Sequence, residues 1–168
     1  MAQTTVVIPG IVEGCTVYAN KEIVARDETL TLPEVNRATY TQKLPGGEQN
    51  MPSTKIEDME TKISKNGLNK NATKFINADN IEARWVQNET ASDGTVSRVG
   101  YKAFMLTRAI TLAPGADIEA GSGVENDITK KVLSYQLYRN GEELVNINKI
   151  TGTVKIDGVD YSIDDSLL

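Results

Sequence analysis

The sequence has 168 residues, with 18 Lys and Arg against 23 Asp and Glu, a formal charge of −5, one Cys and no His. It shows no basic cluster that would grip a phosphate backbone, and no apolar run near the roughly 20 residues of a membrane-spanning helix. The absence of His excludes Ser-His and Cys-His catalytic pairs and His-containing zinc sites, and the single Cys15 can form no internal disulfide.

The first part of the chain is predicted to be extended. Residues 6–20, VVIPGIVEGCTVYAN, are typical of one or two short strands separated by turns, with Cys15 as a small half-buried residue. In residues 27–44, DETLTLPEVNRATYTQKL, leucines and threonines alternate as in a strand, and Pro33 indicates an edge or a bend because it donates no ladder hydrogen bond. Residues 45–55, PGGEQNMPSTK, have the composition of a flexible loop.

Residues 55–64, KIEDMETKIS, fit either a helix or a strand. Ile56, Met59 and Ile63 have helical spacing, whereas Met59, Thr61 and Ile63 alternate as in a strand, and no strong cap decides between them.

The clearest helix signal is residues 69–80, NKNATKFINADN. Asn69 or Asn71 can cap this helix, and its apolar face holds Ala72, Phe75 and Ile76. The helix is short, so it must depend on tertiary packing.

The second half of the chain reads as long strands. Residues 81–88 form a strand with Trp85 as a core anchor, followed by a turn at Asp93-Gly94. Residues 95–112 are apolar on both faces, which predicts that this strand is covered on both sides in the working state.

The best hairpin signal is Asn140-Gly141, between two strand-like runs. Before it, Leu133, Tyr135 and Leu137 are expected to share one face, with Lys131 alongside them. Residues 150–168 are predicted to be an extended C-terminal tail.

Paired carboxylates are the remaining catalytic candidates, at 57–58, 142–143 and 164–165. Adjacent acids in turns or at a chain end are typical of a solvated surface, and no phosphate-cradling glycine motif accompanies them. The sequence therefore predicts no enzyme, no cofactor and no metal site.

The order of these elements resembles the major tail tube proteins of contractile-tailed phages and the tube subunits of the related phage-tail-like bacteriocins, the tailocins. Residues 17–52 look like that family's N-terminal strand, its LTLP entry into a long strand and its Gly-containing loop. Residues 58–75 are similar to its following strand, Asn-Gly turn and short helix, and residues 100–148 to its closing half with a Gly-rich loop and a final hairpin. The specificity lies in order and spacing over nearly the whole chain.

The resemblance implies a mainly β fold: a β-barrel-like pair of antiparallel sheets with one short flanking α-helix, in a single domain of residues 1–168. Hexameric rings with a joint inner β-barrel would stack into a hollow tube inside a contractile sheath. On contraction the tube would pass DNA, or depolarise the target in a tailocin. The resemblance also favours a strand over a helix at residues 55–64.

The implied partners are further copies of the chain, the tail sheath protein, and the baseplate and tail terminator proteins. The tape-measure protein and DNA would lie in the lumen, without sequence-specific binding. The resemblance implies a place in the virion tail, without a membrane anchor, after assembly in the bacterial host cytoplasm.

Two sets of residues are expected to carry the tube function. The long strands at 29–44, 55–65, 97–112 and 126–138 would supply the inner barrel, and Glu60, Lys62 and Gln136 would line its lumen. A long hairpin loop around residues 45–55 would contact the next ring, and the expected contact residues are Pro45, Gly46, Gly47, Glu48, Gln49, Asn50, Met51 and Pro52.

Three alternatives stay open at this point. A type VI-like secretion tube subunit would share the fold and differ in cargo and setting. A monomeric β-sandwich binding module would share the composition but would not polymerise. A hydrolase with a carboxylate pair is the third, and it lacks a companion base.

Overall fold

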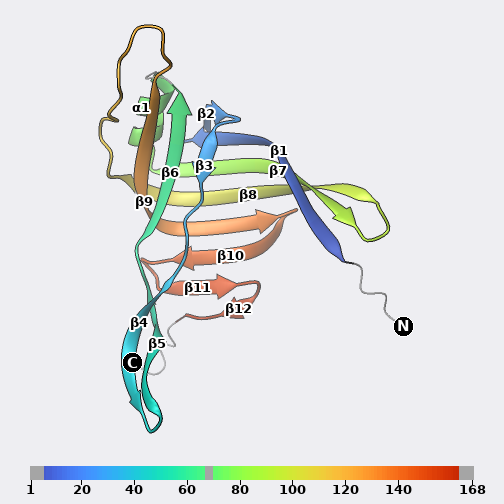
Figure 1. Cartoon of the computed structure of the whole chain (residues 1–168), viewed down its shortest axis with the longest axis vertical. Helices are drawn as coiled ribbons and strands as arrows, with labels where there is room; N and C mark the ends of the chain where they lie inside the picture. The colour runs from blue at the N-terminus through green and yellow to red at the C-terminus, as the bar shows by residue number, and fades with distance from the viewer. Residues whose placement is uncertain (1–5, 67–69, 163–168) are drawn as a thin grey trace.

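The computed structural model describes residues 6–66 and 70–162, and it confirms a mainly β fold with antiparallel pairing and one short helix (Figure 1). The elements in chain order are β1 Val7–Ala19, β2 Glu22–Arg26, β3 Thr29–Thr31, β4 Arg37–Leu44, β5 Gly47–Ile56, β6 Met59–Asn66, α1 Lys70–Asn77, β7 Asn80–Ala91, β8 Val96–Ala109, β9 Glu125–Arg139, β10 Glu142–Asn148, β11 Thr153–Ile156 and β12 Val159–Asp160. Within the described residues α1 is the only helix, and at eight residues it is too short to cross a membrane.

Ten of the strands form one sheet, in the order β12-β11-β10-β9-β8-β7-β1-β2, with β6 paired to β9 and β3 paired to β6. The strands β4 and β5 form a separate hairpin that projects from the body (Figure 1). In the described part of the chain the sheet stays open, with β2 and β12 at its two ends, so a single copy does not close into a barrel.

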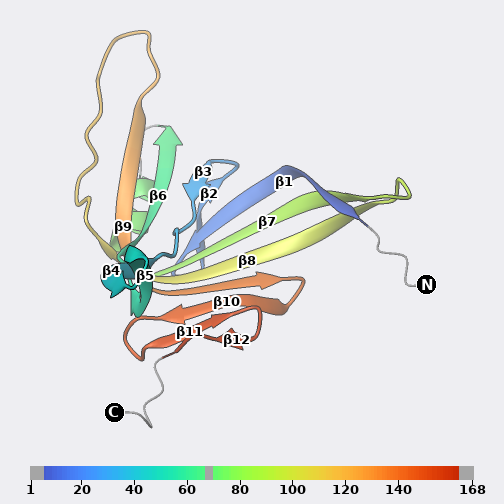
Figure 2. The same cartoon turned by 60° about the horizontal axis from the view of Figure 1, so that its bottom comes forward.

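The sheet bends across β9. Residues 125–132 of β9 pair with β6, whereas residues 134–139 pair with β10. We call β3, β6 and the first part of β9 the upright sheet half, and β1, β7, β8, β10, β11 and β12 with the second part of β9 the transverse sheet half (Figures 1 and 2). Only the last residues of β8, Thr107 to Ala109, pair with the first part of β9, so β8 also crosses the bend and its end belongs to the upright sheet half.

A bulge marks the bend. The β8 partner shifts from Val132 to Ser134, which leaves Leu133 unpaired with β8 and changes which residues face inward. Lys130 and Val132 are buried before the bulge, and Tyr135 is buried after it. The predicted shared face of Lys131 and Tyr135 is therefore wrong, because strict alternation does not survive an extra residue.

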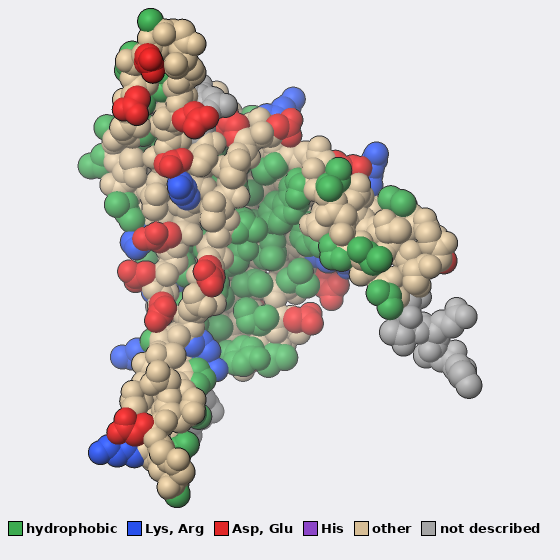
Figure 3. Space-filling view, in the orientation of Figure 1, with side chains coloured by type: hydrophobic (Ala, Val, Ile, Leu, Met, Phe, Trp, Pro, Cys, Tyr) green, Lys and Arg blue, Asp and Glu red, His purple; other side chains and the backbone are tan. Residues whose placement is uncertain are grey.

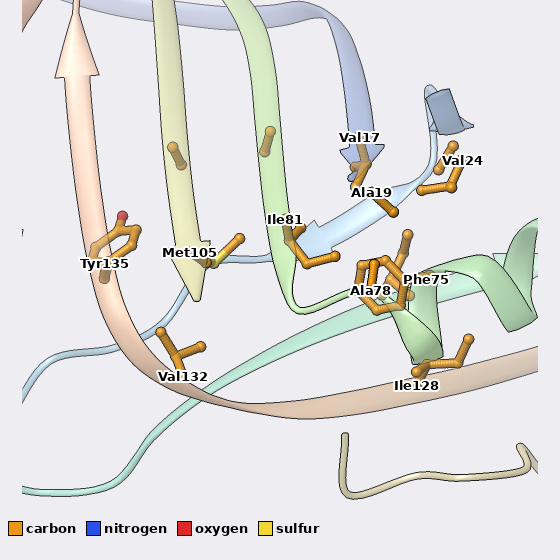
Figure 4. Packing of buried hydrophobic residues seen from close by; sticks show 14 of the residues in the cluster. Val17, Ala19, Val24, Phe75, Ala78, Ile81, Met105, Ile128, Val132 and Tyr135 are labelled. Atoms are coloured by element: carbon orange, nitrogen blue, oxygen red, sulfur yellow. The ribbon is translucent and has the colours of Figure 1, made fainter. Parts of the chain in front are cut away.

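The core lies between the two sheet halves and α1 (Figure 4). Helix α1 contributes Ala72, Phe75 and Ile76 to the core, as the helical spacing predicted, and Phe75 is only 1% exposed. The predicted cap Asn71 lies inside the helix, and Asn69 lies outside the described residues. The cluster also includes Val17, Val24, Met59, Ile63, Ile81, Met105, Ile128, Val132 and Tyr135.

Two segments differ from the sequence-based prediction. Residues 27–44 are not one strand, because β3 ends at Thr31 and β4 begins at Arg37, after Pro33. Residues 47–56 are strand β5 rather than a flexible loop. Their polar side chains suit an exposed hairpin, in which the Thr41 hydroxyl donates to the Asn50 side-chain oxygen over 3.0 Å.

The ambiguous segment at residues 55–64 is extended. It contains the end of β5, a break at Glu57 and Asp58, and the start of β6. This confirms the strand that the family resemblance favoured and rejects the helical spacing.

Candidate assembly surfaces

The two acidic pairs that lie in the described residues are both on the exposed surface. Glu57 and Asp58 are exposed between β5 and β6, and Glu142 and Glu143 are exposed at the start of β10; the pair at 164–165 lies outside the described residues. Over residues 6–66 and 70–162 there is no cluster of three or more His, Cys, Asp or Glu side chains that could hold a metal ion.

Cys15 is half-buried in β1, as predicted. Burial raises the pKa of its thiol, and the Asp27 carboxylate adds to the rise. Its backbone N–H donates to the Asp27 side chain over 3.2 Å. Because a raised pKa lowers the thiolate fraction, this thiol is a poor nucleophile.

The candidate contact residues 45–52 lie at the free end of the β4–β5 hairpin. Pro45 and Gly46 form its turn, and Gly47, with a φ of +133°, begins β5 in a conformation that favours glycine. Tyr40 pairs with Met51 across the hairpin, and Tyr40 and Leu44 are 50% and 44% exposed. The tip therefore offers backbone and partly apolar side chains at one end of the molecule (Figure 1).

The outer face of the upright sheet half carries a charged strip, which we define as Glu60, Lys62, Asp127 and Lys131. Lys62 Nζ lies 3.1 Å from Asp127, and Lys131 pairs with Glu60. Hydrogen bonds from the Ser64 hydroxyl and from Lys62 lower the pKa of Asp127, and the hydrogen bond with Glu60 raises the pKa of Lys131. The positive and negative side chains of the charged strip are therefore paired with each other.

The structure brings Glu60 and Lys62 into the same strip, but it separates Gln136 from them. Gln136 lies beyond the bulge, opposite Phe104 in β8, and its side-chain oxygen accepts from the Tyr138 hydroxyl over 3.2 Å. Its partners in these contacts are therefore aromatic, although Lys21 and Glu82 line the same pocket.

An apolar arm, defined here as Val7, Ile8, Ile11 and Val12, forms the first part of β1. These side chains are 49%, 60%, 71% and 55% exposed. The arm pairs with the last part of β7 and projects with the β7–β8 turn away from the core (Figures 1 and 2). Scattered exposed apolar side chains are ordinary, but four within six positions of one strand are an unusual concentration, which makes the arm a candidate assembly surface.

The inner face of the transverse sheet half ends in an apolar hollow, defined here as Trp85, Tyr101, Leu137 and Val145. Leu137 and Val145 are directly opposite each other in β9 and β10, and the Trp85 and Tyr101 rings stack 5.3 Å apart. These side chains remain half-buried. Figure 3 shows apolar side chains lining a depression between the upright sheet half and the arm.

Sequence reasoning missed Lys130. Its side chain is fully buried, its Nζ donates to the carbonyls of Phe75, over 2.8 Å, and Ala78, and it lies 5.2 Å from the Phe75 ring centroid. Burial lowers its pKa to about 8. Its alternation with Ile128 and Val132 along the strand was a signal that Lys130 is buried, but its positive charge is typical of an exposed residue.

The comparisons with known proteins agree with this architecture. One solved structure similar to the chain is the cryo-EM structure of the anti-feeding prophage cap, the AFP tube terminating cap. It has a TM-score of 0.54 and 16% sequence identity, over 82% of this chain and 99% of that chain, which shows a shared fold. No curated protein sequence matches the chain. The model of the phage tail tube protein FII family matches residues 9–164, and this chain therefore belongs to that family.

Proposed function

We propose that copies of this chain form hexameric rings with a joint inner β-barrel, and that these rings stack into the hollow tube of a contractile tail. Membership of the tail tube family makes the chain a structural component of a tail-type particle and not an enzyme. The finer proposal concerns how the copies meet and what passes between them.

The observation that carries the proposal is a pair of unmatched apolar surfaces on one chain. Val12 lines one pocket with Trp85 of its own chain, whereas the start of β1 projects beyond the body with the β7–β8 turn, and we infer that this projecting part meets the hollow of a neighbouring copy (Figures 1 and 3). A contact between two different surfaces is heterologous and gives a closed ring when its rotation closes. Among the described strands, β12 ends the sheet on one side, and ring formation would cover its outer edge.

Burial of the apolar arm would contribute a substantial free energy to each contact between two copies. Full burial of a Val or Ile side chain contributes about 1.5–3 kcal/mol, and the four arm residues start about half exposed or more. Their burial would therefore contribute on the order of 3–6 kcal/mol for each neighbour before ordering costs. A closed ring repeats this contact at each boundary.

We assign the charged strip to the lumen, together with Gln136. Locally paired charges of both signs leave no basic track that would trap a duplex, and the remaining field is screened within about 8 Å at physiological salt. DNA and the tape-measure protein would occupy this lumen, with the sheath outside and the baseplate and terminator at the ends. The subunit would assemble as a single domain in the host cytoplasm and remain in the virion tail.

We assign the tip of the β4–β5 hairpin, residues 45–52, to the contact between rings. The hairpin is the longest projection along one direction of the body (Figure 1). Its exposed backbone edges can pair with a strand edge of the next ring.

Electron microscopy of the purified protein at high concentration tests the proposal. The wild type should form six-membered rings or hollow tubes of uniform width, and Ile11→Lys should reduce ring formation at least tenfold. Ile150→Lys is the matched control, since Ile150 is 67% exposed and lies in the turn after β10, away from the arm. A wild-type protein that stays monomeric and featureless at high concentration would contradict the tube and favour a monomeric binding module.

Removal of residues 46–51 separates the two contacts. We expect rings to form and tube growth to stop. Normal tubes from this deletion would remove the hairpin from the contact between rings without affecting the proposed ring.

A further inference from the structure

The base of the β4–β5 hairpin is held by residues from the distant C-terminal part of the chain. Arg37 Nε donates to the Ser53 carbonyl over 2.7 Å, and the Arg37 guanidinium lies 6.0 Å from the Tyr161 ring centroid. The backbone N–H of Glu57 donates to the Asn36 carbonyl over 2.9 Å and closes the base. Arg37 therefore joins the two hairpin strands and rests on a third segment.

Tyr161 is itself fixed to the main sheet. Its backbone N–H donates to the Val154 carbonyl over 2.7 Å, and the Ser162 hydroxyl accepts from the Val154 N–H over 2.8 Å. These bonds fold the chain after β12 back against β11, which pairs with β10. The ring under Arg37 is thus anchored to the transverse sheet half.

Lys149 gives a second brace from the same side. Its Nζ donates to the Glu57 carbonyl over 3.3 Å and lies 3.7 Å from the Asp58 carboxylate. Its backbone N–H donates to the Leu133 carbonyl over 3.0 Å, at the bulge of β9. Lys149 therefore connects the hairpin base with the bend of the sheet.

The length of the hairpin makes its angle important. Strand β4 runs from Arg37 to Leu44, and extended residues advance about 3.3 Å each, so the tip lies about 25 Å from the base. A rotation of about 10° at the base moves the tip by about 4 Å, close to the 4.7–4.9 Å spacing of paired strands. An unbraced base would thus let the tip miss a receiving edge by a full strand.

We propose that Arg37 and Lys149 are positioning residues that lock the direction of the hairpin to the C-terminal strands before the hairpin meets the next ring. The lock stands on the contacts within one chain, and its effect on tube growth rests on the proposed function. A segment that is already held in its binding direction loses less conformational entropy when it binds. The lock therefore raises the rate at which rings stack and the affinity between them.

Distances between two spin labels on the monomer test the lock directly. In a Cys15→Ser background, labels at Glu48→Cys near the tip and Ile150→Cys on the body report the hairpin angle by double electron–electron resonance. The protein is kept at a concentration at which sedimentation shows monomers. We expect a narrow distance distribution for the parent, and at least a twofold wider one for the Arg37→Gln, Lys149→Gln double variant.

The control is Lys43→Gln, which changes charge on the same strand near the tip and should leave the width unchanged. If the double variant does not fold, Tyr161→Ala removes only the ring beneath Arg37 and should also widen the distribution, whereas Tyr161→Phe should not. An unchanged width in the double variant, or in Tyr161→Ala, would overturn the lock.

Tube growth then separates the lock from the proposed function. We expect the double variant to form rings normally and to elongate about tenfold more slowly. A wider distribution with normal elongation, combined with normal tubes from the 46–51 deletion, would leave the lock in place and remove the hairpin from the stacking contact.

Discussion

Replacement of Lys130 by methionine should remove a pH dependence from the free energy of unfolding. Lys130 is fully buried beside the end of α1, and its Nζ donates to the carbonyls of Phe75 and Ala78. Desolvation by burial lowers its pKa to about 8, against the attraction of Asp79 and with a smaller lowering by Arg108. Methionine is similar in length and apolar, so it can fill the space without a charge.

The sign follows from proton binding. The folded pKa of Lys130 is about 8 and the ordinary value is 10.5, so between these values the unfolded chain binds more protons. The free energy of unfolding therefore rises with pH across this window and is insensitive to this group well below pH 8. At about 1.36 kcal/mol per pKa unit, the full gain is about 3 kcal/mol, of which about 2 kcal/mol falls between pH 8 and pH 10.

Urea unfolding of the monomer, followed by Trp85 fluorescence at pH 7, 8, 9 and 10, measures this gain. The series stops at pH 10 because burial raises the pKa of Tyr135 to about 12, so ionisation of the unfolded phenol destabilises the fold above pH 10. We expect the wild type to gain about 2 kcal/mol relative to Lys130→Met between pH 8 and pH 10. Lys102→Met, at an exposed position of β8, should keep the wild-type rise. Parallel curves for wild type and Lys130→Met would refute the buried, destabilised ammonium.

Two further substitutions test the packing. Phe75→Ala should cost about 3–5 kcal/mol in the free energy of unfolding, measured by urea, because Phe75 is 1% exposed in the core; Phe75→Leu should cost much less, and equal losses would contradict specific packing. Gly10→Ala should speed hydrogen exchange in the first part of β1. A Cβ at Gly10 would lie 1.8 Å from the side-chain oxygen of Asn88, and this same oxygen accepts a hydrogen bond from the Ile11 N–H over 2.9 Å. The clash would therefore break a hydrogen bond that protects this part of β1. Gly46→Ala, whose Cβ meets nothing within 4 Å, is the control, and exchange that is equally slow in both variants would reject the clash.

Local signals predicted the elements whose causes are local. The Asn140-Gly141 hairpin forms because both residues have positive φ, 48° and 83°, as a type I′ turn requires. The apolar face of α1 followed from helical spacing. The strand at residues 59–66 was decided by the family resemblance alone, because its pattern fitted two periods.

Tertiary causes explain what the sequence did not predict. The bulge at Leu133 depends on a bend between two sheet halves, and no residue near it signals the bend. Apart from Ile56 at its base, the described β4–β5 hairpin packs no apolar side chain on the core, so the hydrophobic alternation that reveals a strand is absent. Lys130 was hidden for a different reason, since its partners are backbone carbonyls about 50 positions away in the sequence. The residues of the apolar hollow look like core in the sequence, and only the folded chain reveals that the hollow is open.

The passage of β8 and β9 through the bend has a mechanical consequence. The two sheet halves are joined by continuous polypeptide and by the hydrogen bonds of the β8–β9 pair, rather than by side-chain contact alone. A force on the upright sheet half is therefore transmitted into the transverse sheet half through the backbone of β8 and β9. The two sheet halves therefore cannot slide past each other or separate within one subunit without breaking the hydrogen bonds of the β8–β9 pair.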